Sequence, residues 1–581
     1  MRNITMRSAI LWINVFLISV TQSVSNCPDI CRCDVIQDRK TVTCNQGGMN
    51  LIPTQEMDKS IQVLRVTAPP EVPNNLTVGR IFQKFHFLEE IHITHSNIPA
   101  IGDSSFWPCQ YLMVLNLSYN KITLLHYSNF IGLKNLVTLD LSNNLIYATP
   151  SAPFYHLKNL NTLSLAGNRL DGLVPRFFYM LSKLRYLDLS GNTLSEVDPD
   201  NFKDLGAVKS LILRKCHLTS LHSLVYQNVP NLEVLDLRDN VFYYIKPFEF
   251  QHLKRLRVLR LDNNYLGDIR ENTFSGHNLD TLNLSRNNII SIDSCAFCNS
   301  SIRHLDASNN RLTLVKKSVF SPLSDSLETL NIGFNKLDHI TVANIIDPLE
   351  KLQRLSLAGM QLEKLFVTTF SQNRNLRYLD LSKNELECLP SAVLEPLTNL
   401  EELDLSNNGL KELQLSTLKI INETSSLQKV RLHSNRWHCS KCNVGSLLAC
   451  LNSSAFLEKL QNESLVCSEP EHLLGRKLET LYPEELEICP LPVTLSRTLT
   501  THLHIGIVVT IVLFVLFLIL LTLACFLTRR HYAVYYTHEN VIEEDKTRNG
   551  DTRDINSQNY LTPKDLRDKK SKKKDMVMRF I

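Results

Sequence analysis

Apolar residues recur along most of the chain in one pattern, which is clearest at Leu136, Leu139, Leu141, Asn144 and Ile146. The pattern is L-x-x-L-x-L-x-x-N-x-L, and its positions are numbered here 1 to 11 from the first leucine. Position 1 of its fifteen copies is occupied by Leu88, Leu112, Leu136, Leu160, Leu184, Val208, Leu232, Leu256, Leu279, Ile302, Leu327, Leu352, Leu376, Leu400 and Leu427. A weaker copy precedes them at 61–66. Each copy predicts a short strand with inward-facing leucines.

A single strand of this kind cannot bury its leucines alone, so consecutive copies must stack over a continuous apolar core. The mean spacing of about 24 residues is typical of leucine-rich repeats. The pattern therefore predicts an α/β solenoid, a leucine-rich-repeat horseshoe of about 15 repeats over residues 61–434. In this fold the strands form a parallel sheet along the concave wall.

Position 9 is nearly always asparagine, whose amide both donates and accepts hydrogen bonds. It holds Asn120, Asn144, Asn168, Asn192, Asn240, Asn264, Asn287, Asn310, Asn335, Asn384, Asn408 and Asn435. These amides are expected to pair backbone groups that the sheet leaves unsatisfied between coils. Ser96, Cys216 and Met360 replace asparagine in three repeats, and we expect the weakest link at Met360, which cannot hydrogen-bond strongly.

A second ladder of large residues lies eighteen positions after position 1. It consists of Phe106, Phe130, Phe154, Phe178, Phe202, Tyr226, Phe250, Phe274, Phe297, Phe320 and Phe370, with Leu394 later. Such regular spacing indicates a buried layer on the convex side. The alternative interpretation is an aromatic cage for a ligand.

The chain begins with features of a secretory signal peptide over residues 1–25, where basic residues precede an apolar run. A signal anchor is the alternative. The next segment, 26–60, contains Cys27, Cys31, Cys33 and Cys44, and it resembles the N-terminal cysteine cap of extracellular leucine-rich-repeat proteins. That resemblance implies the disulfides Cys27–Cys33 and Cys31–Cys44. Four cysteines this close could alternatively bind zinc.

The segment 435–490 resembles the C-terminal cysteine cap of the same proteins through Cys439, Cys442, Cys467 and Cys489. The resemblance implies the pairs Cys439–Cys467 and Cys442–Cys489. The segment departs from the usual cap in its C-x-x-C spacing, in Arg436 where proline is usual, and in an additional cysteine.

The chain has 15 cysteines, and their clustering at the two ends of the repeat array is typical of a secreted protein. The sequence leaves open the pairing of Cys109, Cys216, Cys295, Cys298, Cys388 and Cys450. Cys295 and Cys298 are close enough to bridge within one loop. Cys216 and Cys388 are expected to be small buried apolar residues.

Seven N-x-S/T sequons follow the signal segment, at Asn75, Asn116, Asn283, Asn299, Asn422, Asn452 and Asn462. Each predicts a glycosylation site if the segment is lumenal. Asn116 and Asn283 fall on predicted strands, where their side chains face the concave wall, so glycans there would mask parts of it.

A short stalk (491–504) precedes 23 residues without a charge (505–527), which are enough to span a bilayer as a helix. Arg529 and Arg530 follow directly and place the C-terminal side in the cytosol. The sequence thus predicts a single-pass type I plasma-membrane protein with an extracellular N-terminus.

Residues 528–581 are polar and lysine-rich, which predicts a disordered cytoplasmic tail. The lysines suit a solvated tail or attraction to anionic lipid. Tyr560-Leu-Thr-Pro563 resembles the Y-x-x-P class of SH2-domain ligands, which implies phosphorylation of Tyr560 and an SH2-domain partner.

The net charge of +4 is too small to imply nucleic-acid binding. On the concave wall of the middle repeats the basic residues are Lys209, Arg214, Lys215, Arg238, Arg257, Arg260, Arg286 and Arg303. The acidic residues there are Glu233, Asp236, Asp239, Asp262, Asp280 and Asp306. Such mixed charge suits a protein ligand better than a polyanion. The alternative is a solvated wall without a ligand.

The sequence has no G-x-S-x-G, H-E-x-x-H or glycine-rich phosphate loop, and it predicts no enzyme, metal or cofactor. The ectodomain resembles single-pass leucine-rich-repeat membrane proteins, including tartan- and capricious-type adhesion proteins and Toll-like receptor ectodomains, without the signalling domain of the latter. The resemblance implies a recognition or adhesion receptor for an extracellular or cell-surface protein. The alternatives are a co-receptor or decoy and a structural surface protein. The sequence also leaves open a homo-oligomer.

Overall fold

A computed structural model describes residues 26–194, 196–461, 463–488 and 493–536, which belong to two compact units divided between Cys489 and Pro490. The first unit is the solenoid with its caps, and the second contains the apolar helix. The predicted signal peptide (1–25), Asn462, Cys489 and Tyr560 lie outside the described residues.

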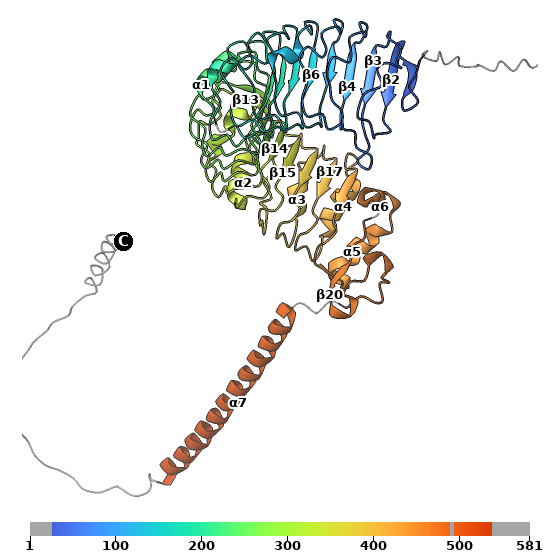
Figure 1. Cartoon of the computed structure of the whole chain (residues 1–581). Helices are drawn as coiled ribbons and strands as arrows, with labels where there is room; N and C mark the ends of the chain where they lie inside the picture. The colour runs from blue at the N-terminus through green and yellow to red at the C-terminus, as the bar shows by residue number, and fades with distance from the viewer. Residues whose placement is uncertain (1–25, 195, 462, 489–492, 537–581) are drawn as a thin grey trace, which may run out of the picture. The chain divides into compact units, whose positions relative to one another are not determined.

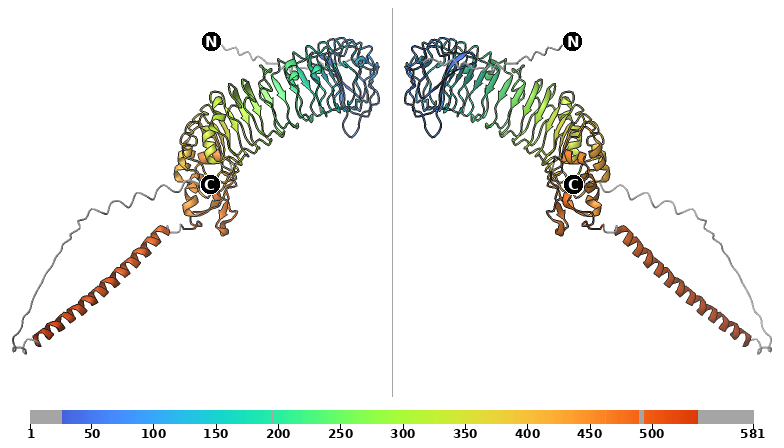
Figure 2. Two further views of the ribbon diagram at one scale, coloured as in Figure 1. Left: turned by 90° about the vertical axis from the view of Figure 1, so that its left-hand side faces the viewer. Right: turned by 90° about the vertical axis from the view of Figure 1, so that its right-hand side faces the viewer.

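One eighteen-stranded sheet runs through the first unit, and its strands lie side by side in chain order along an arc (Figures 1 and 2). The strands are β1 (Arg32–Ile36), β2 (Arg39–Cys44), β3 (Val63–Val66), β4 (Glu90–Ile93), β5 (Val114–Asn116), β6 (Thr138–Asp140), β7 (Thr162–Ser164), β8 (Tyr186–Asp188), β9 (Ser210–Ile212), β10 (Val234–Asp236), β11 (Val258–Arg260), β12 (Asn278–Asn283), β13 (Ser301–Asp306), β14 (Thr329–Asn331), β15 (Arg354–Ser356), β16 (Tyr378–Asp380), β17 (Glu402–Asp404) and β18 (Lys429–Arg431). β1 and β2 pair antiparallel, and all later neighbours pair parallel.

The fifteen copies of the repeat correspond to β4 through β18, and the weaker copy before them is β3. The strands pair in constant register, so each position-4 leucine aligns with its neighbours, as Leu235 does with Leu211 and Leu259. All three are buried. The predicted solenoid of stacked leucine strands is confirmed.

The asparagines at position 9 form the hydrogen-bonded ladder that the pattern predicts. Asn264 Nδ2 donates to Leu261 O and to Leu237 O of the preceding repeat, both at 3.0 Å, and its Oδ1 accepts from Phe242 N at 3.1 Å. Cys216 keeps one such bond, since its Sγ lies 3.3 Å from Leu189 O. Met360 has only its backbone N–H in the ladder, which donates to Asn384 Oδ1 at 2.9 Å.

The aromatic ladder is buried on the convex side, and neighbouring rings pack together, as Phe274 and Phe297 do with centroids 5.8 Å apart. These residues are core, and the cage alternative is wrong. Short helices accompany this layer: α1 (Ser223–Asn228), α2 (His339–Ile346), α3 (Ser391–Leu394), α4 (Leu415–Glu423) and the 3-10 turns η1 (Tyr127–Phe130), η2 (Pro199–Phe202), η3 (Lys317–Val319) and η4 (Ser321–Leu323).

Both ends of the array are closed by disulfide-linked caps. The disulfides Cys27–Cys33 and Cys31–Cys44 crosslink the chain around the β1–β2 hairpin. Its second strand, β2, begins the parallel sheet. At the other end Cys439–Cys467 links the paired strands β19 and β20, and Cys442 is also disulfide-bonded. The C-terminal cap consists of α5 (Lys441–Leu451), α6 (Ser454–Leu460), β19 (Trp437–His438), β20 (Cys467–Glu469), η5 (Glu471–Leu473) and η6 (Leu478–Thr480).

The cysteines outside the caps have different surroundings. Cys295 and Cys298 form a disulfide within one loop. Cys109 and Cys216 are buried free thiols, and burial raises the pKa of each to about 12, which keeps them protonated. Cys388 was expected to be buried but is exposed, because it lies between the inward-facing Leu386 and Leu389 on the outer side of the turn.

The second unit contains one long helix, α7 (Val493–Tyr536). Its segment Ile505–Leu527 has a mean hydropathy of 3.3 and is exposed throughout, so it is long and apolar enough to cross a bilayer. The helix also includes 528–536, which we expected to belong to the disordered tail. Helix propagation explains the difference, because each added residue gains a hydrogen bond once the helix is nucleated.

Candidate ligand-binding surface

Most acidic or amide residues at position 5 of the concave wall have a structural role. Asp140 Oδ1 accepts from the backbone N–H of Ser142 at position 7, at 2.9 Å. The same contact recurs at 2.9–3.0 Å for Asp188, Asp306, Asp380 and Asp404. These carboxylates close the turn that follows each strand. Position 7 is correspondingly small, with Ser, Thr, Ala or Gly in most repeats.

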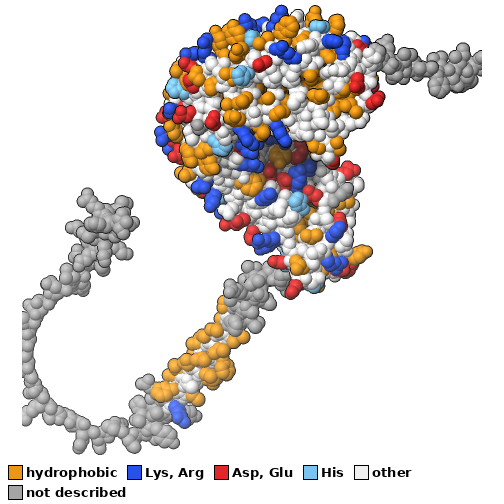
Figure 3. Space-filling model, in the orientation of Figure 1, with side chains coloured by type: hydrophobic (Ala, Val, Ile, Leu, Met, Phe, Trp, Pro, Cys, Tyr) orange, Lys and Arg blue, Asp and Glu red, His pale blue; other side chains and the backbone are white. Residues whose placement is uncertain are grey.

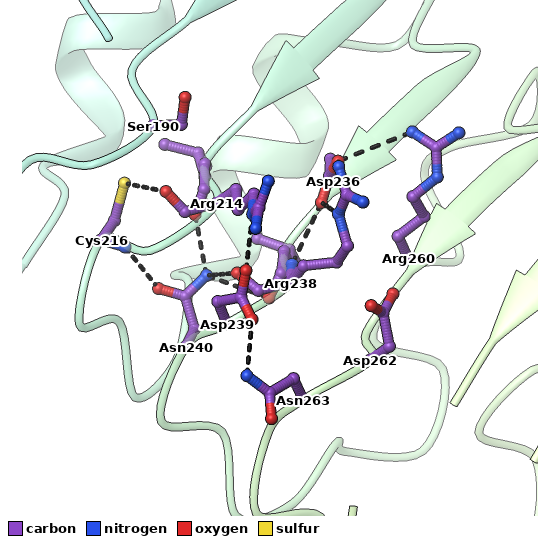
Figure 4. Close-up of polar contacts among 12 residues, drawn as sticks. Ser190, Arg214, Cys216, Asp236, Arg238, Asp239, Asn240, Arg260, Asp262 and Asn263 are labelled. Carbon is purple, nitrogen blue, oxygen red and sulfur yellow. Dashed lines mark hydrogen bonds and ion pairs between the residues drawn. The ribbon is translucent and has the colours of Figure 1, made fainter. Parts of the chain in front are cut away.

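Three consecutive repeats depart from this rule, since Arg214, Arg238 and Asp262 occupy position 7 after β9, β10 and β11. Figure 4 shows Arg238 and Arg260 paired with Asp236 at position 5, and Arg214 paired with Asp239 at position 8. Arg238 binds Asp236 through two hydrogen bonds, of 3.0 and 2.7 Å, and Arg260 Nη1 lies 3.5 Å from the same carboxylate. Asp236 is 1% exposed, so its charge is compensated within the wall.

Two further carboxylates, Asp239 and Asp262, complete a charged cluster, which we define as Arg214, Asp236, Arg238, Asp239, Arg260 and Asp262. Burial acts to raise the pKa of Asp239, but hydrogen bonds from Asn263 and Arg214, both 2.5 Å, lower it below its ordinary value. Burial raises the pKa of Asp262, with Arg238 opposing. Its Oδ1 is buried without a hydrogen-bond partner in the described structure.

A second charged set occupies position 2, beside the cluster. Lys209, Glu233, Arg257, Asp280 and Arg303 belong to five successive repeats and alternate in sign. Lys209 pairs with Glu233 at 2.7 Å, and Asp280 pairs with Arg257 at 3.5 Å and with Arg303 at 3.1 Å. Glu233, Arg257, Asp280 and Arg303 line a hollow of about 510 Å³. Figure 3 shows acidic and basic side chains intermingled on the inner wall.

The structure thus divides the predicted basic residues into three groups. Arg214, Arg238 and Arg260 belong to the cluster, while Lys209, Arg257 and Arg303 belong to the position-2 ladder. Lys215 and Arg286 are exposed at position 8, after β9 and β12. Because most of these cations face a carboxylate, the wall presents mixed charge in the middle repeats.

Two regular features of the repeats were not predicted from the sequence. Every position 8 has a left-handed backbone, with φ between 49° and 68°, including Phe334 and Lys383. A second amide ladder occupies the residue before position 1, where Asn135 and Asn159 each donate to a carbonyl of the preceding repeat at 2.8 Å, and Asn231, Asn375 and Asn399 do likewise. The recurring Asn-Leu dipeptide was the available signal for this ladder.

The sequons fall on different faces. Asn75, Asn299, Asn422 and Asn452 are exposed on loops, turns or helix ends. Asn116 and Asn283 are half-buried at position 5 of the concave wall, on β5 and β12. No group of three or more residues that could bind a metal occurs among the described residues.

Comparison with known proteins identifies the repeat. A family model described as "Leucine rich repeat" matches residues 87–146, 158–218, 206–266, 254–312 and 350–410. The repeats are leucine-rich repeats. They include the segment 206–266, which contains every residue of the charged cluster.

Several known proteins are similar to this chain. Trophoblast glycoprotein of Macaca fascicularis is 28% identical over 260 residues, which is 40% of this chain and 59% of that protein, less than two thirds of its length. Among solved structures, the Drosophila Toll–Spatzle complex has a chain with a TM-score of 0.54 and 20% identity, covering 76% of this chain and 63% of that chain. A leucine-rich-repeat protein of Leptospira interrogans has 24% identity and a TM-score of 0.48, covering 65% and 85%. The Toll similarity shows the fold alone.

Proposed function

We propose that this protein is a cell-surface recognition or adhesion receptor that binds a protein ligand through the concave wall of its leucine-rich repeats. The observation that supports this most is the charged cluster. Three adjacent repeats place Arg214, Arg238 and Asp262 where the regular turn needs only a small residue. Departures from a local structural rule concentrate at functional sites.

The character of the wall suits a folded protein partner. Its charges alternate along position 2 and compensate one another in the cluster, which favours a partner with complementary mixed charge. A continuous polyanion would require a basic stripe. The proposal includes no catalytic role.

The proposal places the solenoid outside the cell and residues after 527 in the cytosol. Support comes from the apolar segment Ile505–Leu527, the arginines that follow it, and the cap disulfides, which form in oxidising compartments. The test uses epitope tags on the full-length protein. A tag placed before Cys27 should stain intact cells, and a C-terminal tag should stain only permeabilised cells. The reverse pattern would refute the orientation.

The ligand is best sought by screening cells that display the full-length protein against secreted and cell-surface proteins. The informative variant is Arg257→Glu, because Arg257 is 67% exposed and its pair with Asp280 is 3.5 Å long, so the fold should tolerate the change. Arg377→Glu is the matched control, because Arg377 is 58% exposed and pairs at 3.3 Å with Glu401, and the two residues directly precede β16 and β17.

We expect Arg257→Glu to weaken ligand binding by about tenfold or more, which is 1.4 kcal/mol, whereas Arg377→Glu should leave the affinity nearly unchanged. Equal effects of the two variants, or no effect of Arg257→Glu, would show that the ligand does not bind at the middle repeats. Surface expression and thermal stability of both variants serve as controls for folding.

The alternative is a co-receptor or decoy that captures its ligand without signalling through its own tail. Deleting 532–581 distinguishes the two. A signalling receptor should then bind ligand normally but lose its output, and a Tyr560→Phe variant should share that loss if an SH2-domain protein binds the tail. A decoy should be unaffected by either change.

A further inference from the structure

Two of the asparagines at position 5 combine a structural contact with a glycosylation sequon. Asn116 Oδ1 accepts from Ser118 N at 2.9 Å, and Asn283 Oδ1 accepts from Ser285 N at 3.0 Å. This is the turn contact that Asp140 and Asp188 make at the same position. The fold therefore uses only the amide oxygen, which a carboxylate can replace.

The amide nitrogens of these two residues are in a different situation from those of the position-9 ladder. Ladder asparagines such as Asn144 are buried and donate through Nδ2 to carbonyls, at 3.0 Å for Leu117 and Leu141. Asn116 and Asn283 are half-buried on the concave wall, and no hydrogen bond of the described structure uses their Nδ2. A substituent on that nitrogen would project from the wall and leave the turn intact.

Among the repeats between these two sites, those of β9, β10 and β11 differ from the rest of the wall. Strands β6 to β11 lie between β5 and β12 and span roughly 29 Å at about 4.8 Å per strand. This stretch contains the charged cluster and the first part of the position-2 ladder. From β13 to β17, positions 5 and 7 return to a small or turn-closing pair in every repeat, as in Asp380 with Ser382.

We propose that Asn116 and Asn283 carry N-linked glycans that bracket a window over β6 to β11, and that the ligand is a folded protein domain with a mixed-charge face narrow enough to enter this window. The inference rests on the proposed function and specifies where its partner binds. A ligand that extended along the whole wall would collide with both glycans.

The modification itself needs a lipid-pyrophosphate-linked oligosaccharide in the secretory lumen. The asparagine nitrogen forms a bond to the anomeric carbon of the first sugar and loses one proton. The bond between that carbon and the phosphate oxygen breaks, and the lipid pyrophosphate leaves. No oxidant or reductant takes part.

The chain offers matched substitutions for testing this. Asn116→Asp and Asn283→Asp remove the acceptor nitrogen and keep the turn that Asp makes in other repeats. Conversely, Asp188→Asn creates Asn-Leu-Ser on β8, inside the window, and Asp404→Asn creates it on β17, outside the window. All four changes preserve size and turn geometry, and each adds or removes one glycan.

The first measurement is the mass of the full-length protein made in mammalian or insect cells, before and after endoglycosidase treatment. Each Asn→Asp variant should lose one glycan, and each Asp→Asn variant should gain one. Absence of a change in Asn116→Asp or in Asn283→Asp overturns the inference, whatever the ligand.

The second measurement is binding of the protein ligand obtained from the cell-display screen. Asp188→Asn should weaken binding by about tenfold or more, endoglycosidase should restore it, and Asp404→Asn should change it less than about twofold. If the Asp188→Asn variant carries its glycan and still binds the ligand normally, the proposed window is wrong. It is also wrong if the Asn116→Asp, Asn283→Asp double variant binds the ligand with higher affinity. If the screen yields no protein ligand, the proposed function fails, while the mass measurement still decides whether the glycans exist.

Discussion

Arg238 donates two side-chain hydrogen bonds to Asp236 on the concave wall, from Nε to Oδ1 at 3.0 Å and from Nη2 to Oδ2 at 2.7 Å. Asp236 also accepts from the Arg238 backbone N–H at 3.1 Å and is almost fully buried. The arginine therefore compensates a charge that the wall has removed from water, in addition to any role in binding.

Replacing Arg238 should consequently destabilise the fold. We expect Arg238→Ala to lower the free energy of unfolding by about 2–3 kcal/mol, because Asp236 remains buried and keeps only the backbone N–H of residue 238 and the 3.5 Å contact from Arg260. The double variant Asp236→Ser with Arg238→Ala reproduces the Ser164 and Ala166 pair of another repeat and should be close to wild type. Chemical denaturation measures both. A double variant as unstable as the single one would contradict this account.

The position-9 ladder predicts a graded loss of stability. Asn264→Ala leaves Leu237 O, Leu261 O and Phe242 N without their partner, so we expect a loss of about 3 kcal/mol. Asn264→Cys should lose less, because Cys216 occupies this position and keeps a contact with a carbonyl of the preceding repeat.

The control for the ladder is Asn399→Ala in the exposed amide ladder, where water can replace the amide. Its loss should be below about 1 kcal/mol, although it removes a bond of 2.9 Å. Equal losses at Asn264 and Asn399 would show that burial does not set the contribution of these amides.

The sequence predicted the features that depend on one residue type at one spacing. Inward leucines and the amide ladder were predictable because every coil needs them. The pairing of charges was missed, although Lys209 and Glu233 share position 2 and constant register makes equal positions neighbours. The left-handed position 8 was hidden by residues such as Phe334, which seldom adopt it. The turn role of Asp140 emerged only from its contact with Ser142.

Phe334 and Gly359 occupy position 8 of adjacent repeats and should be energetically coupled. A Cβ on Gly359 would lie 2.5 Å from Phe334 Cδ1, and Gly359 itself has φ +63°. Gly359→Ala should therefore destabilise by about 1–2 kcal/mol from the backbone, plus the clash with the ring. In a Phe334→Asn background only the backbone part remains. A double-mutant cycle by thermal unfolding measures the coupling, and strictly additive effects would disprove the contact.

The stability of the fold should depend on pH through Asp262, and its neighbour Asp239 should contribute a pH dependence of opposite sign. Burial raises the pKa of Asp262, so the folded state holds its proton more tightly than the unfolded state does. Ionisation of Asp262 therefore destabilises the folded state. This penalty is fully present above the folded-state pKa and disappears as the pH falls through the ordinary aspartate range. The pKa of Asp239 is lowered, so its contribution has the opposite sign and is lost in acid.

Asp262→Ser, which installs the commonest residue at position 7, should therefore raise the melting temperature at pH 7. The gain should shrink toward pH 4 as the wild-type carboxyl is protonated. Asp239→Asn should lower the melting temperature at pH 7 and converge with wild type in acid. Melting curves between pH 3.5 and pH 7.5 measure both, and a gain for Asp262→Ser that did not change with pH would mean that sterics, rather than the buried charge, limit stability at this position.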